Sequence, residues 1–376
     1  MHVAVDFTAG VRQPAGVGRY TRSLVKALAT SPGPALDLTL LWAGPARVPP
    51  PADWPHTRTR RLPLPERWMT ILWQRARVPL PADVLAGGAD VFYSPDFALP
   101  PLRRARSAVT VHDLSFLTHP QTHYPPLRAY LEQVVPRSVA RADLVLADSE
   151  QTRRDLVSYL GVPEQKVAVV LSAPDPAFQR VEDEAQRRAV LQRWGIDGPY
   201  VISVGTIQPR KNLPAIFQAL RRLRDDGQDL LLVHVGGKGW LYEPIFAALD
   251  ASGVKDRVRL LQGVGDADLA ALYSGAMALV FPSLYEGFGL PCLEAMACGT
   301  PVIASNAGSL PEVVGDAGIL VDPHDIDAIA TGVKRLLDDA DLREALIRRG
   351  YEQAVRFRWE TSGLQLRGLL AGLAQR

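Results

Sequence analysis

Two adjacent cations, Arg210 and Lys211, stand where an apolar, strand-like run gives way to a helical pattern. The loop that joins the strand-like run to the helical pattern also contains Gly205 and Thr206. Asn212 is placed to be the N-cap of the helix. Ligands of open parallel sheets bind at the carboxyl ends of strands. A guanidinium fork beside an ammonium point charge matches a diphosphate. From the residues alone, a solvated pair of surface charges remains the alternative.

Two carboxylates, Glu286 and Glu294, bracket a glycine-containing stretch that follows another apolar run. Gly287 and Gly289 allow bare backbone to approach a ligand. The pattern predicts a helix that opens at about Pro291 with Glu294 in its first turn, so free amides and a positive dipole end would face the loop. The two carboxylates could then accept hydrogen bonds from a polyhydroxylated ligand. The alternative is a glycine-rich turn in which Glu294 only favours the helix dipole.

The loop 13–20 lies between the first predicted strand and the first long helix, and it contains Gly16 and Gly18. It lacks the third glycine of the dinucleotide fingerprint, which disfavours a nicotinamide enzyme such as an NAD-dependent sugar epimerase. The loop can still bring backbone amides close to a phosphate or a sugar.

A histidine and an acid, His112 and Asp113, end a further predicted strand. A strand-end histidine beside an acid suits a functional group, and a structural histidine is the alternative. The sequence has no HExxH, no DxD and no Ser-His-Asp order of a hydrolase. We therefore expect neither a metal site nor a cofactor.

The elements that must position these residues alternate between short apolar runs and helical patterns along 376 residues, which predicts α/β domains with parallel sheets. Six strands are expected in each half. Those of the first half are 2–7, 36–42, 91–93, 108–111, 144–147 and 167–170. Those of the second half are 200–204, 230–235, 258–261, 278–281, 301–304 and 319–321.

Length and the stiff, proline-containing stretch after residue 172 indicate two domains. We expect an N-terminal domain over 1–174, a C-terminal domain over 175–358 and a terminal helix over 359–376. The net charge of +2 does not favour a nucleic-acid partner. The two cysteines form no disulfide framework, and no apolar stretch is long enough for a membrane helix, so a cytoplasmic protein is expected.

Taken together, these stretches resemble the retaining glycosyltransferases of family 4, which include glycogen synthase and bacterial mannosyltransferases. The resemblance covers nearly the whole chain and is carried by the glycine loop, the His-Asp pair, the stretch Asp148-Ser149-Glu150, the Arg-Lys pair and the Glu-x7-Glu element. It implies the GT-B fold, two Rossmann-like domains that face each other across a cleft. The N-terminal domain would bind the acceptor and the C-terminal domain the nucleotide-sugar donor.

The resemblance also implies roles for the C-terminal residues. Arg210 and Lys211 would contact the donor diphosphate, Glu286 would hold hydroxyls of the transferred sugar, and Glu294 would hold the ribose. The remaining donor-binding positions in this half would be Gly205, Thr206, Val264, Asp266, Phe288, Gly289 and Leu290, with Val264, Asp266 and nearby Asp268 in the loop where the family places base contacts.

In the N-terminal half, His112 would lie near the anomeric centre, with Asp113 beside it. Gly16 would approach the donor phosphate as the cleft closes, and Gly18 belongs to the same loop. The final helix resembles the family segment that crosses back to the first domain. No catalytic metal is implied.

The implied activity is metal-independent, retaining transfer of a hexose from a nucleotide sugar to a glycan or lipid-linked glycan in polysaccharide or glycolipid synthesis. GDP-mannose is the first choice of donor, and UDP-glucose or another UDP-sugar is the alternative. A catalytically silent, nucleotide-sugar-binding partner protein is the alternative from another functional class.

One further feature, the mixture of cations and large apolar residues in segments 58–61 and 66–77, suggests a second partner. It leads to the hypothesis of peripheral attachment to an anionic membrane, at its inner face, through Trp68 and Trp73 among others. The alternative is a core-packing helix with solvated arginines.

Overall fold

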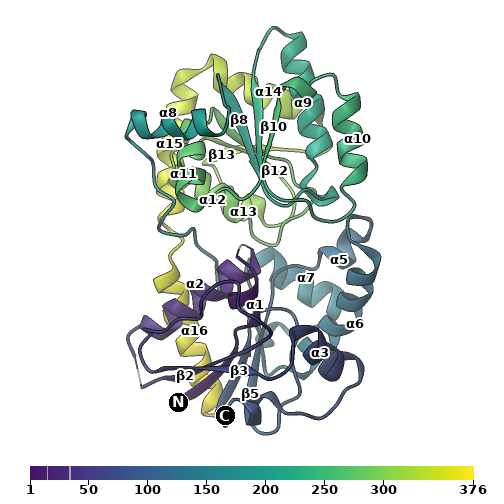
Figure 1. Cartoon of the computed structure of the whole chain (residues 1–376), viewed down its shortest axis with the longest axis vertical. Coiled ribbons are helices and arrows are strands. Elements are labelled where there is room, and N and C mark those ends of the chain that lie inside the picture. The colour runs from purple at the N-terminus through teal and green to yellow at the C-terminus, as the bar shows by residue number, and fades with distance from the viewer. Residues whose placement is uncertain (15, 34) are drawn as a thin grey trace. The chain divides into compact units, whose positions relative to one another are not determined.

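The computed structural model describes residues 1–14, 16–33 and 35–376 and divides into two compact units (Figure 1). Unit 1 comprises Met1–Leu114, Ala129–Ser172 and Arg358–Arg376, and unit 2 comprises Ser115–Arg128 and Ala173–Phe357. The segment Ser115–Arg128 therefore groups with unit 2, whereas the sequence-based boundaries place it in the first domain.

Unit 1 is built on a seven-stranded sheet in the order β3-β2-β1-β4-β5-β6-β7, with every paired strand parallel. The central strands are apolar and buried on both faces, as parallel strands covered by helices must be. The strands are β1 His2–Asp6, β2 Asp37–Ala43, β3 Thr57–Leu62, β4 Val91–Ser94, β5 Arg106–Val111, β6 Leu144–Ala147 and β7 Val167–Val169. The helices are α1 Thr8–Arg12, α2 Val17–Thr30, α3 Glu66–Thr70, α4 Ala82–Leu85, α6 Pro125–Arg141 (which begins in unit 2), α7 Glu150–Leu160 and α16 Trp359–Ala374.

Strand β3 is the one element of this sheet that the sequence reasoning missed, so the expectation of six strands in the first half was wrong. Its sequence alternates threonine and arginine, and most of its residues are exposed. It pairs only with β2, at the edge of the sheet. Charged side chains are a usual protection of an edge strand, but they remove the apolar run by which a buried strand is recognised.

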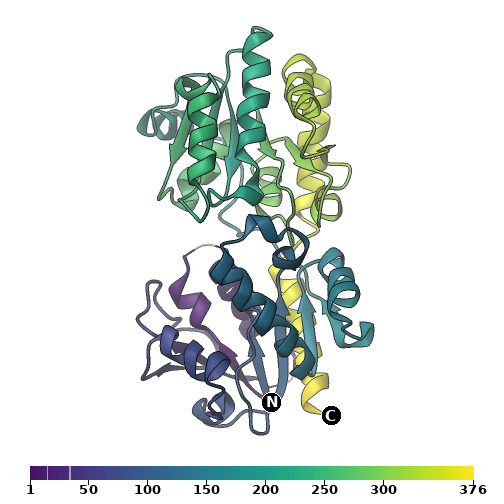
Figure 2. The same cartoon turned by 90° about the vertical axis from the view of Figure 1, so that its right-hand side faces the viewer.

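The terminal helix α16 packs within unit 1, as Figure 2 shows for the yellow helix beside the strands. Ser362 Oγ donates a hydrogen bond of 2.6 Å to the carbonyl of Leu171. Gly363 lies so close to α2 that a Cβ there would come within 2.5 Å of the Ala27 backbone. The close approach of α2 and α16 therefore depends on a glycine.

Unit 2 contains a six-stranded parallel sheet in the order β10-β9-β8-β11-β12-β13. The strands are β8 Tyr200–Val204, β9 Leu231–Val235, β10 Val258–Leu261, β11 Ala278–Phe281, β12 Val302–Ser305 and β13 Gly318–Val321. The helices are α5 Ser115–Thr118, α8 Glu184–Arg193, α9 Leu213–Asp225, α10 Glu243–Ala251, α11 Asp266–Gly275, α12 Leu290–Ala297, α13 Leu310–Val314, α14 Ile326–Asp338 and α15 Ala340–Ala354. All six strands of the second half lie where the sequence predicts them.

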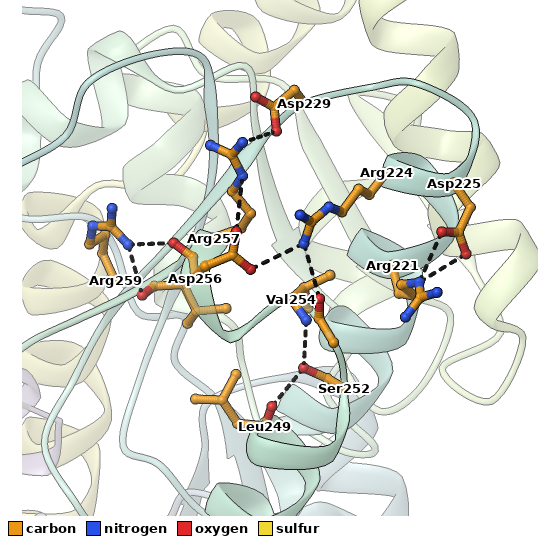
Figure 3. A network of polar contacts seen from close by, with 12 residues as sticks. Arg221, Arg224, Asp225, Asp229, Leu249, Ser252, Val254, Asp256, Arg257 and Arg259 are labelled. Atoms are coloured by element: carbon orange, nitrogen blue, oxygen red, sulfur yellow. Dashed lines mark hydrogen bonds and ion pairs between the residues drawn. The ribbon is translucent and has the colours of Figure 1, made fainter.

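Because all strands of unit 2 run in one direction, its sheet has one carboxyl edge and one amino edge. The carboxyl edge carries the loops with the predicted donor-binding residues. Near the amino edge, around the end of α9 and the start of β10, lies a network of surface ion pairs (Figure 3).

Within residues 1–14, 16–33 and 35–376, none of the helices combines the length and hydropathy that a transmembrane span requires.

Candidate functional site

The predicted cations and the first predicted carboxylate meet at the carboxyl edge of unit 2. Strands β8 and β11 are neighbours, so the loops that follow them lie together. Glu286 Oε1 lies 2.6 Å from Lys211 Nζ, and Glu286 Oε2 lies 2.8 Å from an Arg210 guanidinium nitrogen. The three side chains are 9–13% exposed. We call Arg210, Lys211 and Glu286 the charged triad.

The turn before α9 holds the two cations in place. A 3₁₀ turn over Pro209–Lys211 ends at Asn212, whose backbone is left-handed with φ 54°. Asn212 Nδ2 donates hydrogen bonds to the carbonyls of Pro282 (3.1 Å) and Pro323 (2.7 Å). Asn212 is the N-cap residue of α9, as predicted, but its side chain makes no capping hydrogen bond and instead ties three loops of the carboxyl edge together.

Close packing of glycines positions Lys211. A Cβ on Gly205 would lie 2.9 Å from Lys211 Cε, and a Cβ on Gly236 would overlap the Gly205 carbonyl. On its other side the ammonium lies 4.6 Å from the centroid of the Phe281 ring. The lysine stem therefore crosses a surface without side chains, and its charge is directed at Glu286.

Electrostatics favour the ionised form of Glu286. Burial alone raises the pKa of Glu286, but the charges of Arg210 and Lys211 outweigh it and lower that pKa to about 2. Burial lowers the pKa of Lys211, and the Glu286 carboxylate opposes this. Two basic side chains thus share one carboxylate in a buried setting that suits an anionic ligand.

The loop after β11 is pinned by backbone contacts. Ser309 Oγ donates hydrogen bonds to the carbonyls of Glu286 (3.0 Å) and Phe288 (2.6 Å). Gly308 lets this contact form, because a Cβ there would lie 2.5 Å from the Glu286 carbonyl. Helix α12 then begins at Leu290, with Gly289 in the N-cap position at φ 118°. This confirms the predicted helix start, and it places the free amides of the first turn next to the charged triad.

Glu294 lies deeper in α12 than the sequence suggests. It follows the first turn of the helix, where no acid is found, and it is 5% exposed. The Tyr273 hydroxyl donates a 3.3 Å hydrogen bond to its carboxylate. The expectation of a first-turn position was wrong, because the helix begins one residue before Pro291.

The remaining predicted positions of unit 2 lie along the same edge. Gly205 and Thr206 follow β8, Val264 lies between β10 and α11, and Asp266 is the first residue of α11. The nearby Asp268 contacts Arg193 (3.0 Å) and accepts a hydrogen bond from the Trp194 indole (2.9 Å).

In unit 1, His112 follows β5 and is held by two acceptors. Its Nδ1 lies 2.6 Å from a carboxylate oxygen of Asp148, and its Nε2 lies 2.9 Å from the Pro95 carbonyl. Tyr20 and Phe97 pack edge-on against the ring, with centroids at 4.7 and 5.3 Å. Both nitrogens must donate, so the ring is an imidazolium.

The protonation of His112 follows from its neighbours. Burial lowers its pKa, but the Asp148 carboxylate more than compensates and raises it to about 9. Sequence reasoning associated His112 with the adjacent Asp113, and it counted Asp148 among the residues of the family resemblance without giving it a role. The sequence signal for this contact is that Asp148 directly follows strand β6. Strands β5 and β6 are parallel neighbours, so they end at the same edge of the sheet.

The glycine loop of unit 1 leads into α2. Gly16 is its N-cap at φ 56°, and a Cβ on Gly18 would overlap the Gln13 carbonyl. Ala15 lies outside the described residues. The predicted residues thus form two sets, one in unit 1 (Gly16, Gly18, His112 and Asp113) and the rest in unit 2. In the part of the chain that the structure describes, no three His, Cys, Asp or Glu side chains are grouped as metal ligands.

Comparison with protein families and known proteins shows what this chain is similar to. Residues 187–353 match the family "Glycosyl transferases group 1", and residues 14–178 match "Glycosyltransferase Family 4". The O-antigen chain mannosyltransferase B of Escherichia coli is 36% identical over 278 residues, which are 73% of this chain and 72% of that protein.

Two further relatives match over smaller parts of their length. The serotype-specific mannosyltransferase WbdA of E. coli is 31% identical over 61% of this chain and 29% of that protein. A D-inositol 3-phosphate glycosyltransferase of Salinispora tropica is 37% identical over 59% of this chain and 49% of that protein. The chain therefore spans less than two thirds of these two relatives.

Solved structures share the fold over nearly the full length. Sucrose-phosphate synthase from Thermosynechococcus elongatus superposes with a TM-score of 0.77 at 24% identity, over 99% of both chains. Anabaena HepE in complex with UDP and glucose gives a TM-score of 0.75 at 18% identity, over 98% of this chain and 99% of that one. The predicted fold class, two α/β domains with parallel sheets, is confirmed.

Proposed function

The chain belongs to glycosyltransferase family 4 and has the GT-B fold, and on that premise we propose that it transfers a hexose from a nucleotide sugar to a glycan or lipid-linked glycan with retention of anomeric configuration. The observation that carries this proposal is the charged triad, buried at the carboxyl edge of the unit 2 sheet and next to the start of α12.

We propose GDP-mannose as the donor. The support is that two of the relatives are mannosyltransferases. A UDP-sugar is the second candidate, because HepE, which shares the fold, was solved with UDP-glucose.

The charged triad suggests how the donor would react. Breaking the bond between sugar and diphosphate places negative charge on the β-phosphate, where Arg210, Lys211 and the α12 amides would stabilise it. The phosphate would replace Glu286 as the partner of the cations, and the carboxylate would turn to the sugar hydroxyls. Because these fixed positive groups stabilise the leaving group, we propose that no metal is required.

His112 sets a condition on where the acceptor proton goes. An imidazolium whose two nitrogens both donate has no lone pair with which to accept a proton. We propose that His112 acts as a cationic hydrogen-bond donor, and that the departing phosphate takes the proton of the acceptor hydroxyl.

A donor screen tests the proposal. Thermal melting would be followed with GDP-, UDP-, ADP- and dTDP-sugars in the presence of EDTA. A donor at about 100 times its Kd adds about 2.7 kcal/mol to the free energy of unfolding and raises the melting temperature. Turnover of the best donor would be followed by mass spectrometry, with Glu286→Ala and Lys211→Ala as controls. Stabilisation without turnover in any acceptor mixture would favour a silent nucleotide-sugar-binding protein, and unchanged turnover in both variants would remove the site assignment.

A lipid-linked acceptor would require the enzyme to work at a membrane surface, and unit 1 carries features that suit such a surface.

A further inference from the structure

Unit 1 exposes a cluster of arginines that the proposed chemistry does not use. Six of them lie between residues 54 and 82, a stretch whose single acid is Glu66, and that acid is already paired with Arg12 at 3.1 Å. The six are Arg58, Arg60, Arg61, Arg67, Arg75 and Arg77, and each is exposed. Among the described residues, none of the six forms an ion pair.

Large apolar side chains are exposed among these cations. Trp68 is 50% exposed and carries the Arg67 guanidinium 5.6 Å above its ring. Val84 is 48% exposed, Leu64 38% and Val78 37%, so half of the eight exposed large apolar residues of the described chain fall within 64–84.

Several contacts connect the segments that carry these side chains. A Cβ on Gly87, just after α4, would lie 3.4 Å from an Arg60 guanidinium nitrogen, which places the edge strand β3 beside α4. The Asp83 carboxylate of α4 accepts hydrogen bonds from the backbone amides of Arg103, Arg104 and Ala105. The exposed Arg103 and Arg104 thus join the same region. We call the exposed residues of β3, α3, α4 and the linking segments the basic surface.

Trp73 does not belong to the basic surface. Its indole donates a 2.9 Å hydrogen bond to the Leu80 carbonyl, and its side chain is half-buried. Trp73 lies in the π-helix Ile71–Arg75, and its hydrogen bond fixes the segment that follows this helix, so its role is structural. Of the two tryptophans suggested by the sequence, only Trp68 is free to contact a partner.

We propose that the basic surface docks unit 1 on a membrane rich in anionic lipid, such as the negatively charged cytoplasmic leaflet. The unpaired arginines match anionic headgroups, and Trp68 and the other exposed apolar side chains enter the interface between headgroups and acyl chains. Nucleic acid would use the arginines but would leave the scattered valine and leucine side chains without a role. This docking proposal rests on the proposed function in one respect only, namely that the acceptor is a lipid-linked glycan.

Vesicle co-sedimentation of the full chain tests the proposal. Phosphatidylcholine vesicles with and without about 30% phosphatidylglycerol would be compared at low and high salt. We expect binding only to the anionic vesicles, weakened by salt. Each arginine removed should lower the partition coefficient about fivefold, so Arg58→Ser/Arg60→Ser/Arg61→Ser should nearly abolish binding. Trp68→Ser should weaken it by about tenfold.

The matched control is Arg221→Ser/Arg224→Ser in unit 2, which removes exposed arginines that are ion-paired and should leave binding within twofold. Melting temperatures would show that each variant is folded. Equal binding to neutral vesicles, equal loss in the control, or retention on RNA without vesicle binding would overturn the proposal. Sugar transfer to a soluble acceptor without vesicle binding would overturn the membrane-docking proposal and leave the proposed function intact. Vesicle binding without sugar transfer would support membrane docking and overturn the proposed function.

Discussion

The two ends of helix α9 each carry a pair of adjacent cations, and their surroundings differ. Arg210 and Lys211 precede the helix at the carboxyl edge of the sheet, are 13% and 12% exposed, and share the Glu286 carboxylate. Arg221 and Arg222 lie near its end, are 51% and 54% exposed, and pair with Asp225 and Asp327. Two adjacent cations in the sequence therefore do not by themselves indicate a binding site. Burial and a place at the carboxyl edge of the sheet distinguish the candidate binding pair from the solvated pair.

The charge balance differs in the same way. In the network of Figure 3, Arg221, Arg224 and Arg257 each have a carboxylate partner, among Asp225, Asp256 and Asp229. The charged triad keeps two cations on one carboxylate. These three arginines are paired with carboxylates in contact with solvent, whereas Arg210 and Lys211 are buried and share the carboxylate of Glu286.

Removing the triad carboxylate should have the largest effect. Glu286→Gln leaves two buried cations without a counter-charge and removes the proposed sugar contact, so kcat/KM should fall about 10³-fold or more. Steady-state kinetics with the best donor measures this. The matched change in the network is Asp225→Asn, which should stay within twofold. Similar losses in both would erase the distinction between the two regions.

Neutralising the triad lysine should come next. Lys211→Met keeps the stem over Gly205 but removes the charge offered to the departing phosphate, so kcat should fall about 10²- to 10³-fold. The fall should appear in kcat more than in KM if the charge acts chiefly in the transition state. Arg222→Met is the control, and a rise in KM with kcat unchanged would assign Lys211 to ground-state binding.

The pair of His112 and Asp148 extends the comparison to unit 1, since it too is buried and charged. A histidine pKa raised from ~6.5 to about 9 contributes up to about 3 kcal/mol of stability. That contribution is fully present below pH ~6.5 and is lost as the pH rises through about 9. Asp148→Asn should therefore reduce the free energy of unfolding at pH 6 far more than at pH 10. Denaturant titrations at both pH values, with NMR of the His112 ring, measure this, and an equal loss at both would contradict it.

Breaking the exposed network should have the smallest effect. Arg224 and Asp256 are 42% and 59% exposed, so Arg224→Ala should cost about 0–1 kcal/mol and less at high salt. Chemical denaturation at low and high salt is the measurement. A cost above about 2 kcal/mol would show that the network is a structural element on a par with the triad.

The sequence predicts well what depends on apolar runs and helix-start signals. The central strands follow from burial on both faces of a parallel sheet, and the start of α12 follows from its glycine and proline signals. Strand β3 was not predicted, because its arginines face solvent on both sides and leave no apolar run.

The side-chain partners could not be predicted in the same way. That Glu286 neutralises Arg210 and Lys211, that Asp148 charges His112, and that Asn212 binds two distant carbonyls depend on loops brought together by the fold. From the local sequence, the acid nearest to His112 is Asp113, and Asn212 is the N-cap that the structure confirms. The side-chain partners of both residues come from strand ends far apart in sequence, which local patterns do not reveal.

The most direct test of the account is a crystal structure of the full chain with GDP-mannose or the best donor of the screen. The account predicts diphosphate oxygens within about 3 Å of Arg210 and Lys211, with Glu286 released from at least one cation and turned to the sugar. A diphosphate bound away from these residues, with the charged triad still closed on itself, would contradict it.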